Sequence, residues 1–224
     1  MKARIAEIFK SVQGEGIYHG IEQVFVRFYG CNLKCNYCDT PLTSHEELEV
    51  PELLNRISSF GKDYHSISFT GGEPLLQVDF LKELLPGTKT RGIKAYLETN
   101  GILYQELSGV IDYVDIVAMD FKLPSSTGMP AFWQEHEKFL SIALKKEVFV
   151  KIVVLNSTSQ KEIGKSVSLI RSFNKDIPLV LQPEFIQSKE EELIKKMKVF
   201  KNLASQYLKN VSIRPQQHKL QGVK

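Results

Sequence analysis

The sequence predicts an α/β fold built on a parallel, barrel-like sheet. Segments rich in β-branched and aromatic residues alternate with segments of helical periodicity along the chain of 224 residues. Such alternation is typical of parallel strands joined by right-handed crossover helices. Polar or glycine-rich clusters follow most of the expected strands, and in barrel-like α/β folds the active site lies at that carboxyl edge. We therefore expect the functional residues to meet at one mouth of a single domain spanning residues 1–224.

The expected strands are short runs of β-branched and aromatic residues. Residues 22–29 (EQVFVRFY) show this composition most clearly. Residues 148–155 form the most apolar run, which is interrupted by Lys151. In chain order, the expected strands are residues 4–9, 22–29, 65–69, 93–98, 113–119, 148–155, 177–181 and 211–214.

The expected helices lie between and after these strands. Residues 44–60 are assigned to one helix because acidic residues come early and Leu53, Leu54 and Ile57 are spaced for one face. Several connections are short, so some crossover helices are expected to be reduced. In chain order, the expected helices are residues 44–60, 78–85, 104–110, 130–144, 159–172 and 188–208.

The composition is that of an ordinary globular protein, with 42% apolar and 25% charged residues. The net charge of +3 is small and the basic residues are scattered, so no nucleic-acid partner is expected. The chain shows no signal-peptide core at its start and no apolar run long enough to cross a bilayer. We therefore expect a cytoplasmic protein without a membrane partner.

The three cysteines of the chain are Cys31, Cys35 and Cys38, all within eight residues. An odd, clustered set favours reduced metal ligands over disulfides. Structural zinc sites usually take four protein ligands, often as two CxxC pairs, and no second pair exists here. Iron–sulfur clusters commonly use four cysteines. Three cysteines on a 4Fe–4S cluster would leave one iron open for a cofactor, whereas a zinc site would need a distant histidine to complete it.

The spacing CxxxCxxC, with the aromatic Tyr37 before the third cysteine, resembles the signature of the radical S-adenosylmethionine (SAM) superfamily. This resemblance implies a partial (β/α)6 barrel and a 4Fe–4S cluster whose open iron binds SAM. One electron, from a donor such as flavodoxin or ferredoxin, then cleaves SAM to a 5′-deoxyadenosyl radical that takes a hydrogen atom from the substrate. The cofactor supplies the difficult chemistry, and the protein supplies orientation and exclusion of water.

A second motif, residues 70–74 (TGGEP), follows an expected strand about thirty residues after the cysteines. A strand that runs into a Gly-Gly turn and then a helix leaves backbone N–H groups free at its carboxyl end. Radical SAM proteins have a similar turn at this place and use it for the amino group of SAM. The motif therefore agrees with the resemblance of the cysteine loop.

Within that superfamily the chain resembles the 7-carboxy-7-deazaguanine synthase family over nearly its full length. No cysteine remains for a second cluster, which excludes many other subgroups. The matching stretches are residues 8–16 (IFKSVQGEG), Arg27, residues 38–40 (CDT), 70–74 (TGGEP), 98–101 (ETNG), 182–183 (QP) and 217–219 (QHK). The resemblance implies a homodimeric lyase that uses Mg2+. It would convert 6-carboxy-5,6,7,8-tetrahydropterin to 7-carboxy-7-deazaguanine with loss of ammonia, in 7-deazapurine and queuosine biosynthesis.

The resemblance also assigns residue roles. Cys31, Cys35 and Cys38 hold the cluster, and Thr40 binds Mg2+, a hard cation that keeps several waters. The expected SAM contacts are Tyr37, Cys38, Asp39, Gly72, Glu73, Asp120, Phe121, Lys122 and Gln182. The expected substrate contacts are Val12, Gln13, Gly14, Arg27, Thr70 and His218. Many relatives have Ser-Pro-Lys where this chain has residues 120–122 (DFK), so this chain departs from the family there.

Two other functions compete with this interpretation. A glycyl-radical enzyme activase is also small and uses one cluster, but a protein substrate would not need the QGEG loop and Arg27 as a site for a pterin carboxylate. A zinc-binding module without enzymatic activity is the other. The histidines outside the tail, His19, His45, His65 and His136, are expected to be surface or packing residues.

Overall fold

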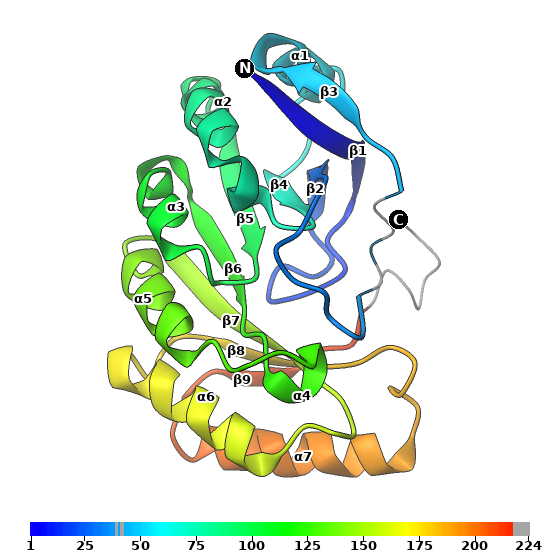
Figure 1. Cartoon of the computed structure of the whole chain (residues 1–224), viewed down its shortest axis with the longest axis vertical. Helices are drawn as coiled ribbons and strands as arrows, with labels where there is room; N and C mark the ends of the chain where they lie inside the picture. The colour runs from blue at the N-terminus through cyan, green and yellow to red at the C-terminus, as the bar shows by residue number, and fades with distance from the viewer. Residues whose placement is uncertain (39, 41–42, 217–224) are drawn as a thin grey trace.

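The structure is a computed structural model that describes residues 1–38, 40 and 43–216. It contains one nine-stranded sheet, curved into an incomplete barrel (Figure 1). The strands are β1 Lys2–Val12, β2 Glu22–Phe28, β3 Glu46–Glu49, β4 Ser66–Gly71, β5 Lys94–Thr99, β6 Ile116–Asp120, β7 Glu147–Val154, β8 Leu179–Pro183 and β9 Val211–Ile213.

The sheet order is β3-β1-β2-β4-β5-β6-β7-β8-β9. Strands β2 and β4 to β9 are parallel, whereas β1 pairs antiparallel with both β2 and β3. The two end strands, β3 and β9, do not pair with each other in the described part of the chain. These features confirm the predicted α/β fold with a partial barrel.

Most of the helices form an arc on the outer, convex face of the sheet, whereas the short α4 lies inside this arc (Figure 1). The connection from β5 to β6 consists of a single-turn helix and a 3₁₀ turn, so the expected reduction of some crossovers is confirmed. No described helix has the length and apolar character that a bilayer crossing requires. The helical segments are α1 Val50–Ser58, η1 Pro74–Gln77, α2 Val78–Thr90, α3 Tyr104–Ser108, η2 Ile111–Tyr113, α4 Pro124–Thr127, α5 Trp133–Ala143, α6 Gln160–Phe173 and α7 Glu191–Ser205.

The two faces of the sheet have different cores. Alternate side chains of each strand point outward and pack under the helices, as the period of two along a strand requires. The inner face carries a smaller apolar cluster of Tyr96, Ile116, Ala118, Phe149 and Val180, against which Ile17 and Tyr18 pack. The loop of residues 13–21, which joins β1 to β2, therefore folds into the interior of the barrel and closes it below the mouth.

Gly16 allows this loop to lie against the barrel wall. Its φ is +68°, and a Cβ at this position would lie 2.6 Å from Cζ of Phe149. We expect Gly16→Ala to lower the free energy of unfolding by roughly 1–3 kcal/mol, measured by urea unfolding, through left-handed strain plus the clash. Gly20→Ala is the matched control, since Gly20 has a φ of +90° in the same loop but open space around it. Equal losses in both variants would show that the contact with Phe149 contributes nothing.

The predicted helix over residues 44–60 is wrong in its first part. Residues Glu46–Glu49 form strand β3, which pairs with β1 in the register Lys2↔Glu49 to Ile5↔Glu46. Leu48 is buried while its neighbours are exposed, as in a strand with one buried face. Helix α1 begins only at Val50, with proline in its first turn, where the missing N–H costs nothing. Pairing with the free edge of β1 therefore makes residues 46–49 a strand, and Pro51 favours a helix that starts only at Val50, although the sequence pattern of residues 44–60 is helical.

Four further helix boundaries differ from the prediction by three residues or more. Helix α2 continues through Pro86 to Thr90, because Leu84, Leu85 and Thr88 are buried against the core and offset the loss of one hydrogen bond. Helix α5 begins at Trp133 rather than at residue 130, and α7 spans Glu191–Ser205 rather than residues 188–208. The ends of the strands that were predicted lie within two residues of the observed ends, with two exceptions of three residues each. Strand β1 continues from the predicted end at residue 9 to Val12, and β6 begins at Ile116 rather than at residue 113.

Candidate active site

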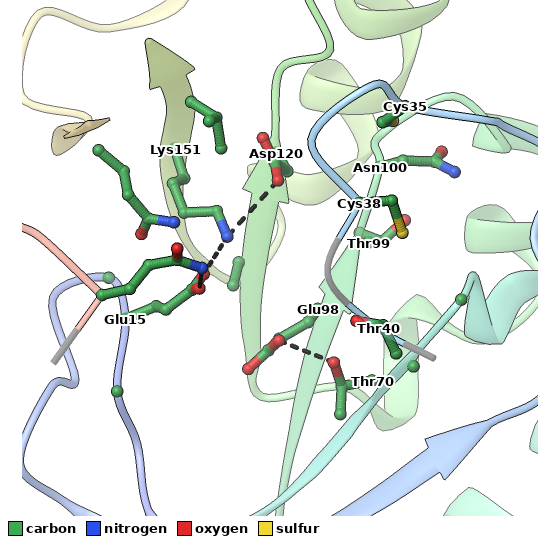
Figure 2. Close-up of a pocket in the computed structure, with 18 of the residues that line it drawn as sticks. Glu15, Cys35, Cys38, Thr40, Thr70, Glu98, Thr99, Asn100, Asp120 and Lys151 are labelled. Atoms are coloured by element: carbon green, nitrogen blue, oxygen red, sulfur yellow. Dashed lines mark hydrogen bonds and ion pairs between the residues drawn. The ribbon is translucent and has the colours of Figure 1, made fainter. Parts of the chain in front are cut away.

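A cavity of about 400 Å³ opens at the carboxyl edge of the sheet, between the cysteine loop and the loop of residues 13–21 (Figure 2). Residues from most of the strand ends line it. The polar clusters that follow the strands therefore meet at one mouth of the barrel, as the sequence predicts. The predicted site residues that line it are Val12, Gln13, Gly14, Arg27, Cys31, Cys35, Tyr37, Cys38, Thr40, Thr70, Gly72, Asp120, Lys122 and Gln182.

Two predicted site residues that the structure describes do not line it. Glu73 and Phe121 are described but buried behind the wall, at 0% and 1% exposure. Phe121 points to the outer core because it alternates with Asp120, which faces inward. Asp39 and His218 lie outside the described residues.

The cysteine loop is held by a few specific contacts. The Cys38 amide donates to the carbonyl of Cys35 at 3.1 Å, which forms a turn between two cysteines. The side-chain amide of Asn100, at the end of β5, donates to Oδ1 of Asn32 at 2.7 Å. All three thiols are free, and those of Cys31 and Cys38 belong to exposed residues. The thiols are therefore accessible from the cavity for metal binding.

No three His, Cys, Asp or Glu side chains within the described ranges converge on one metal ion. A 4Fe–4S cluster does not require ligands that converge on a single metal ion, because each cysteine thiolate binds a separate iron. Three free thiols on one loop, among the residues that line the cavity, are a donor set that such a cluster can use.

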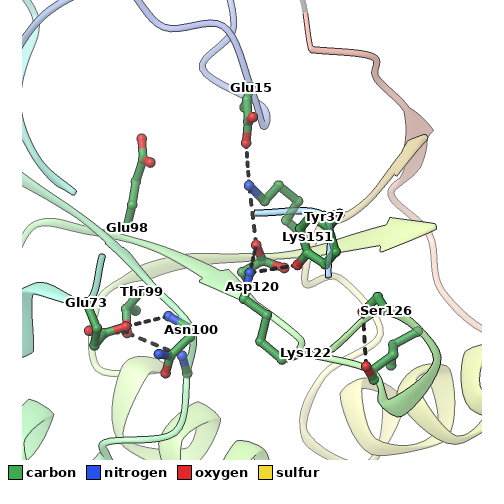
Figure 3. Close-up of polar contacts among 12 residues, drawn as sticks. Glu15, Tyr37, Glu73, Glu98, Thr99, Asn100, Asp120, Lys122, Ser126 and Lys151 are labelled. Atoms are coloured by element: carbon green, nitrogen blue, oxygen red, sulfur yellow. Dashed lines mark hydrogen bonds and ion pairs between the residues drawn. The ribbon is translucent and has the colours of Figure 1, made fainter. Parts of the chain in front are cut away.

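Glu73 supports the cavity wall from behind. One of its carboxylate oxygens accepts from the amide of Leu75 at 3.1 Å, and the other accepts from the amide of Asn100 at 2.8 Å. The hydroxyl of Thr99 lies 3.0 and 3.1 Å from the two oxygens (Figure 3). Glu73 thus ties the Gly-Gly turn to the end of β5. Burial raises the pKa of Glu73 to about 7, although these hydrogen bonds oppose the rise.

This raised pKa predicts a pH-dependent stability. Between its ordinary value of 4.5 and about 7, the folded state keeps a proton on Glu73 that the unfolded state releases. Its contribution to the free energy of unfolding therefore falls as the pH rises through this window, by on the order of 3 kcal/mol. Glu73→Gln should remove this part of the slope, and should also cost about 1–3 kcal/mol because an amide NH2 would face a backbone donor.

Urea unfolding of the apoprotein at about pH 5 and about pH 8 measures this slope. Glu191→Gln, on the exposed face of α7, is the matched control and should keep the slope of the unchanged protein. If Glu73→Gln also kept that slope, Glu73 would titrate near its ordinary value in the folded state.

One wall of the cavity is a network of hydrogen bonds that neutral amide and hydroxyl side chains make around the carboxylate of Glu98. Its Oε1 accepts from the side-chain amide of Gln13 at 2.7 Å and from the hydroxyl of Ser68 at 3.1 Å. Its Oε2 accepts from the hydroxyl of Thr70 at 2.8 Å (Figure 2). The Gln13 amide also donates to Gln23 at 2.9 Å. The network fixes Gln13, and with it the loop of residues 13–21, against strands β2, β4 and β5.

A second wall is a chain of charged groups (Figure 3). Lys151 on β7 pairs with the carboxylate of Glu15 and lies 3.5 Å from Oδ2 of Asp120. The ammonium of Lys122 lies 2.7 Å from the same Oδ2 and 2.8 Å from the hydroxyl of Tyr37. Burial lowers the pKa values of Lys122 and Lys151, but the facing carboxylates outweigh it and the net pKa of each is raised. Both lysines therefore carry a positive charge beside the cavity.

Arg27 lies at the antiparallel side of the mouth. Its Nε is 3.2 Å from Oε2 of Glu7, and its guanidinium lies over the ring of Phe9, 5.5 Å from the centroid. Phe9 in turn stacks on Phe25 with ring centroids 5.0 Å apart. An arginine beside an aromatic shelf, in a cavity, is suited to a flat ligand that carries a carboxylate.

Two buried acceptors line the cavity without a hydrogen-bond donor in the described part of the chain. They are Oδ1 of Asp120 and Oε1 of Gln182, on residues that are 9% and 1% exposed. Buried acceptors are normally satisfied. A cofactor with hydroxyl and ammonium groups, such as SAM, would supply the missing donors, so the residues present fit the predicted cofactor.

Sequence analysis missed several residues of the site. Glu98 was noted only as part of a turn motif, and Lys151 only as an interruption of an apolar strand. A lysine in the centre of a buried strand is nevertheless a recognisable signal, since it must find a charged partner. His136 was expected to be a surface or packing residue. It is buried, its ring stacks on that of Phe121 with centroids 4.5 Å apart, and burial lowers its pKa to about 4.

Comparison with known proteins agrees with this geometry. The model of the radical SAM superfamily matches residues 25–170. The 7-carboxy-7-deazaguanine synthase of Geobacter sulfurreducens is 40% identical over 98% of this chain and 97% of its own. That of Archaeoglobus fulgidus is 35% identical over the full length of both. The crystal structure of QueE from Escherichia coli has the same fold, with a TM-score of 0.66 at 20% identity over 96% of this chain and 94% of its own.

Proposed function

Because the chain belongs to the 7-carboxy-7-deazaguanine synthase family of radical SAM enzymes, we propose that it converts 6-carboxy-5,6,7,8-tetrahydropterin to 7-carboxy-7-deazaguanine with loss of ammonia. The observation that carries this proposal is a single cavity that brings together three free thiols, the Gly-Gly turn and Arg27. The thiols and the turn fit the cofactors of the superfamily. Arg27 fits a substrate carboxylate, which a general radical SAM site does not need.

The cofactor end of the cavity lies beside the cysteine loop. We assign Cys31, Cys35 and Cys38 to the 4Fe–4S cluster, which when bound supplies the electron for reductive cleavage of SAM. Gly72 offers backbone groups to the methionine end of SAM. Tyr37, Asp39, Asp120, Lys122 and Gln182 are assigned to the rest of SAM. Glu73 and Phe121 act from behind the wall, by holding the turn and the end of β6.

The substrate end lies between Arg27 and the Glu98 network. We assign the substrate carboxylate to the guanidinium of Arg27, whose planar fork can donate two parallel hydrogen bonds. Thr40 is assigned to Mg2+, through which it would meet the same carboxylate. The polar edge of the pterin is assigned to the loop around Gln13 and to Thr70. The further substrate contacts we propose are Val12, Gly14 and His218.

The proposal includes further components. An external reductant must supply the electron, and we propose a small electron carrier such as flavodoxin or ferredoxin. Residues 1–224 are proposed to act as one domain, and the enzyme as a homodimer. Reduced thiols fit a cytoplasmic location.

Anaerobic incubation of the reconstituted protein with SAM, a reductant, Mg2+ and the tetrahydropterin tests the function. The family resemblance implies that the 5′-deoxyadenosyl radical takes the hydrogen at C6 of the pterin and that SAM is regenerated in each turnover. Mass spectrometry should therefore find 7-carboxy-7-deazaguanine in amounts that exceed the SAM consumed. Cleavage of SAM without this product would contradict the proposal. In that case the glycyl-radical activase, which uses the same cofactors on a protein, would become the first alternative.

A further inference from the structure

Among the described residues that line the cavity, Lys151 is the one whose cationic group joins segments from its two ends. Its strand, β7, is otherwise apolar from Val148 to Val154, and its side chain is only 17% exposed. Placing an ammonium group there requires anionic partners, because a buried unpaired charge is strongly unfavourable. The structure supplies two carboxylates, Glu15 and Asp120, from segments far apart in the sequence (Figure 3).

The contact with Glu15 leads to the substrate end. Glu15 belongs to the loop of residues 13–21, and its amide donates to Oε1 of Gln13 at 3.0 Å. Gln13 donates in turn to Glu98, which accepts from Thr70. Glu15 also accepts from the side chain of Gln216 at 2.6 Å. The position of Glu15 therefore determines how the loop lies against the substrate wall.

The contact with Asp120 leads to the cofactor end. Oδ2 of Asp120 holds the ammonium of Lys122, which in turn holds the hydroxyl of Tyr37. Tyr37 precedes Cys38 directly, so this part of the chain ends at the cysteine loop. Asp120 also lines the cavity with its Oδ1, which has no hydrogen-bond partner within the described ranges of the chain. Its orientation thus affects both the cysteine loop and the cofactor.

We propose that Lys151 is a positioning residue that couples the two ends of the cavity, so that SAM is cleaved productively only when the substrate loop is in place. The inference rests on the proposed function for its catalytic consequence, but not for the physical link. Without the ammonium, Glu15 and Asp120 lose their common counter-ion. The loop of residues 13–21 then loses its ionic contact with β7 and keeps its packing against Phe149 and the hydrogen bond from Tyr18 to Glu147. The cysteine loop keeps its contact with Lys122.

Lys151→Met tests this with a neutral side chain of similar length. We expect KM for the pterin to rise about tenfold or more, with a much smaller change in KM for SAM, as loss of a charge-assisted contact implies. We also expect more 5′-deoxyadenosine per molecule of 7-carboxy-7-deazaguanine. Lys151→Arg should restore most of the coupling. Lys195→Met, on the exposed face of α7, is the matched control and should behave as the unchanged enzyme.

A second readout needs neither cofactor nor substrate. In the apoprotein, amide hydrogen exchange of Gln13 and Glu15 should be about tenfold faster in Lys151→Met, while strand β5 keeps its protection. The double variant Glu15→Gln with Lys151→Met should be no worse than either single variant, because all three break the same pair. Should Lys151→Met fail to fold, Glu15→Gln alone is expected to show the same exchange and the same uncoupling.

The proposal is overturned if exchange in residues 13–21 is unchanged, or if product per SAM cleaved stays at the level of the unchanged enzyme. It is also overturned if KM for the pterin and KM for SAM rise equally. If the unchanged enzyme makes no product from the pterin, the proposed function fails, and the exchange experiment still decides whether Lys151 holds the loop.

Discussion

Replacing Cys35 with alanine is expected to abolish reductive SAM cleavage, by at least three powers of ten, because an iron without its thiolate leaves the cluster incomplete. Cys35 is the least exposed of the three cysteines and forms the turn to Cys38. Its thiol contributes no hydrogen bond to the surrounding fold within the described residues, so the barrel itself should persist. The measurement is 5′-deoxyadenosine formed anaerobically with dithionite.

Two measurements separate loss of the cluster from loss of the fold. The visible absorption of the cluster should fall sharply, while the circular dichroism of the apoprotein stays unchanged. Lys34→Ala is the matched control, since Lys34 is exposed on the same loop and is not a ligand. A Cys35→Ala protein that still formed 5′-deoxyadenosine at the normal rate would show that Cys35 is not a ligand.

Arg27→Ala is expected to lower the affinity for the pterin by roughly one to two powers of ten, since a charge-assisted bidentate pair contributes on the order of 1.5–3 kcal/mol. Slow SAM cleavage without the pterin should survive, because no described contact joins Arg27 to the cysteine loop. Arg27→Lys keeps the charge but loses the planar fork, and should recover part of the affinity. The measurement is KM for the pterin together with the uncoupled cleavage rate.

Thr40→Ala extends this prediction to the metal. It should lose most of the stimulation by Mg2+, because the hydroxyl is the proposed protein ligand. Arg56→Ala is the control for removing an arginine, since Arg56 pairs with Glu52 on the exposed side of α1. Normal turnover of the pterin in both Arg27→Ala and Thr40→Ala, with an unchanged Mg2+ response, would exclude the carboxylate assignment and favour the activase.

The site was predictable wherever its residues lie in short local motifs. The cysteine spacing and the TGGEP turn each place their residues within eight positions, and local geometry determines what they can bind. Strand ends were predictable for the same reason, since a polar cluster after an apolar run indicates the mouth. Phe121 was assigned to the cavity with its neighbours because the alternation of faces along β6 was not applied there.

The rest of the site depends on contacts between distant segments. Gln13 and Glu98 are 85 residues apart, and Lys151 and Glu15 are 136 apart. Such pairs follow from the register of the strands, which composition does not encode strongly. Strand β3 was missed for a related reason, because its pairing with the free edge of β1 outweighs a local helical pattern. These contacts and strand β3 are therefore determined by tertiary pairing, which local propensity does not predict.

The transfer of deuterium from C6 of a labelled 6-carboxy-5,6,7,8-tetrahydropterin tests the central claim most directly. The reconstituted enzyme is incubated anaerobically with unlabelled SAM, Mg2+ and dithionite, and SAM is analysed by mass spectrometry. The account predicts that deuterium appears in SAM over repeated turnovers, together with 7-carboxy-7-deazaguanine. Product without deuterium in SAM, or SAM cleavage without product, would contradict it.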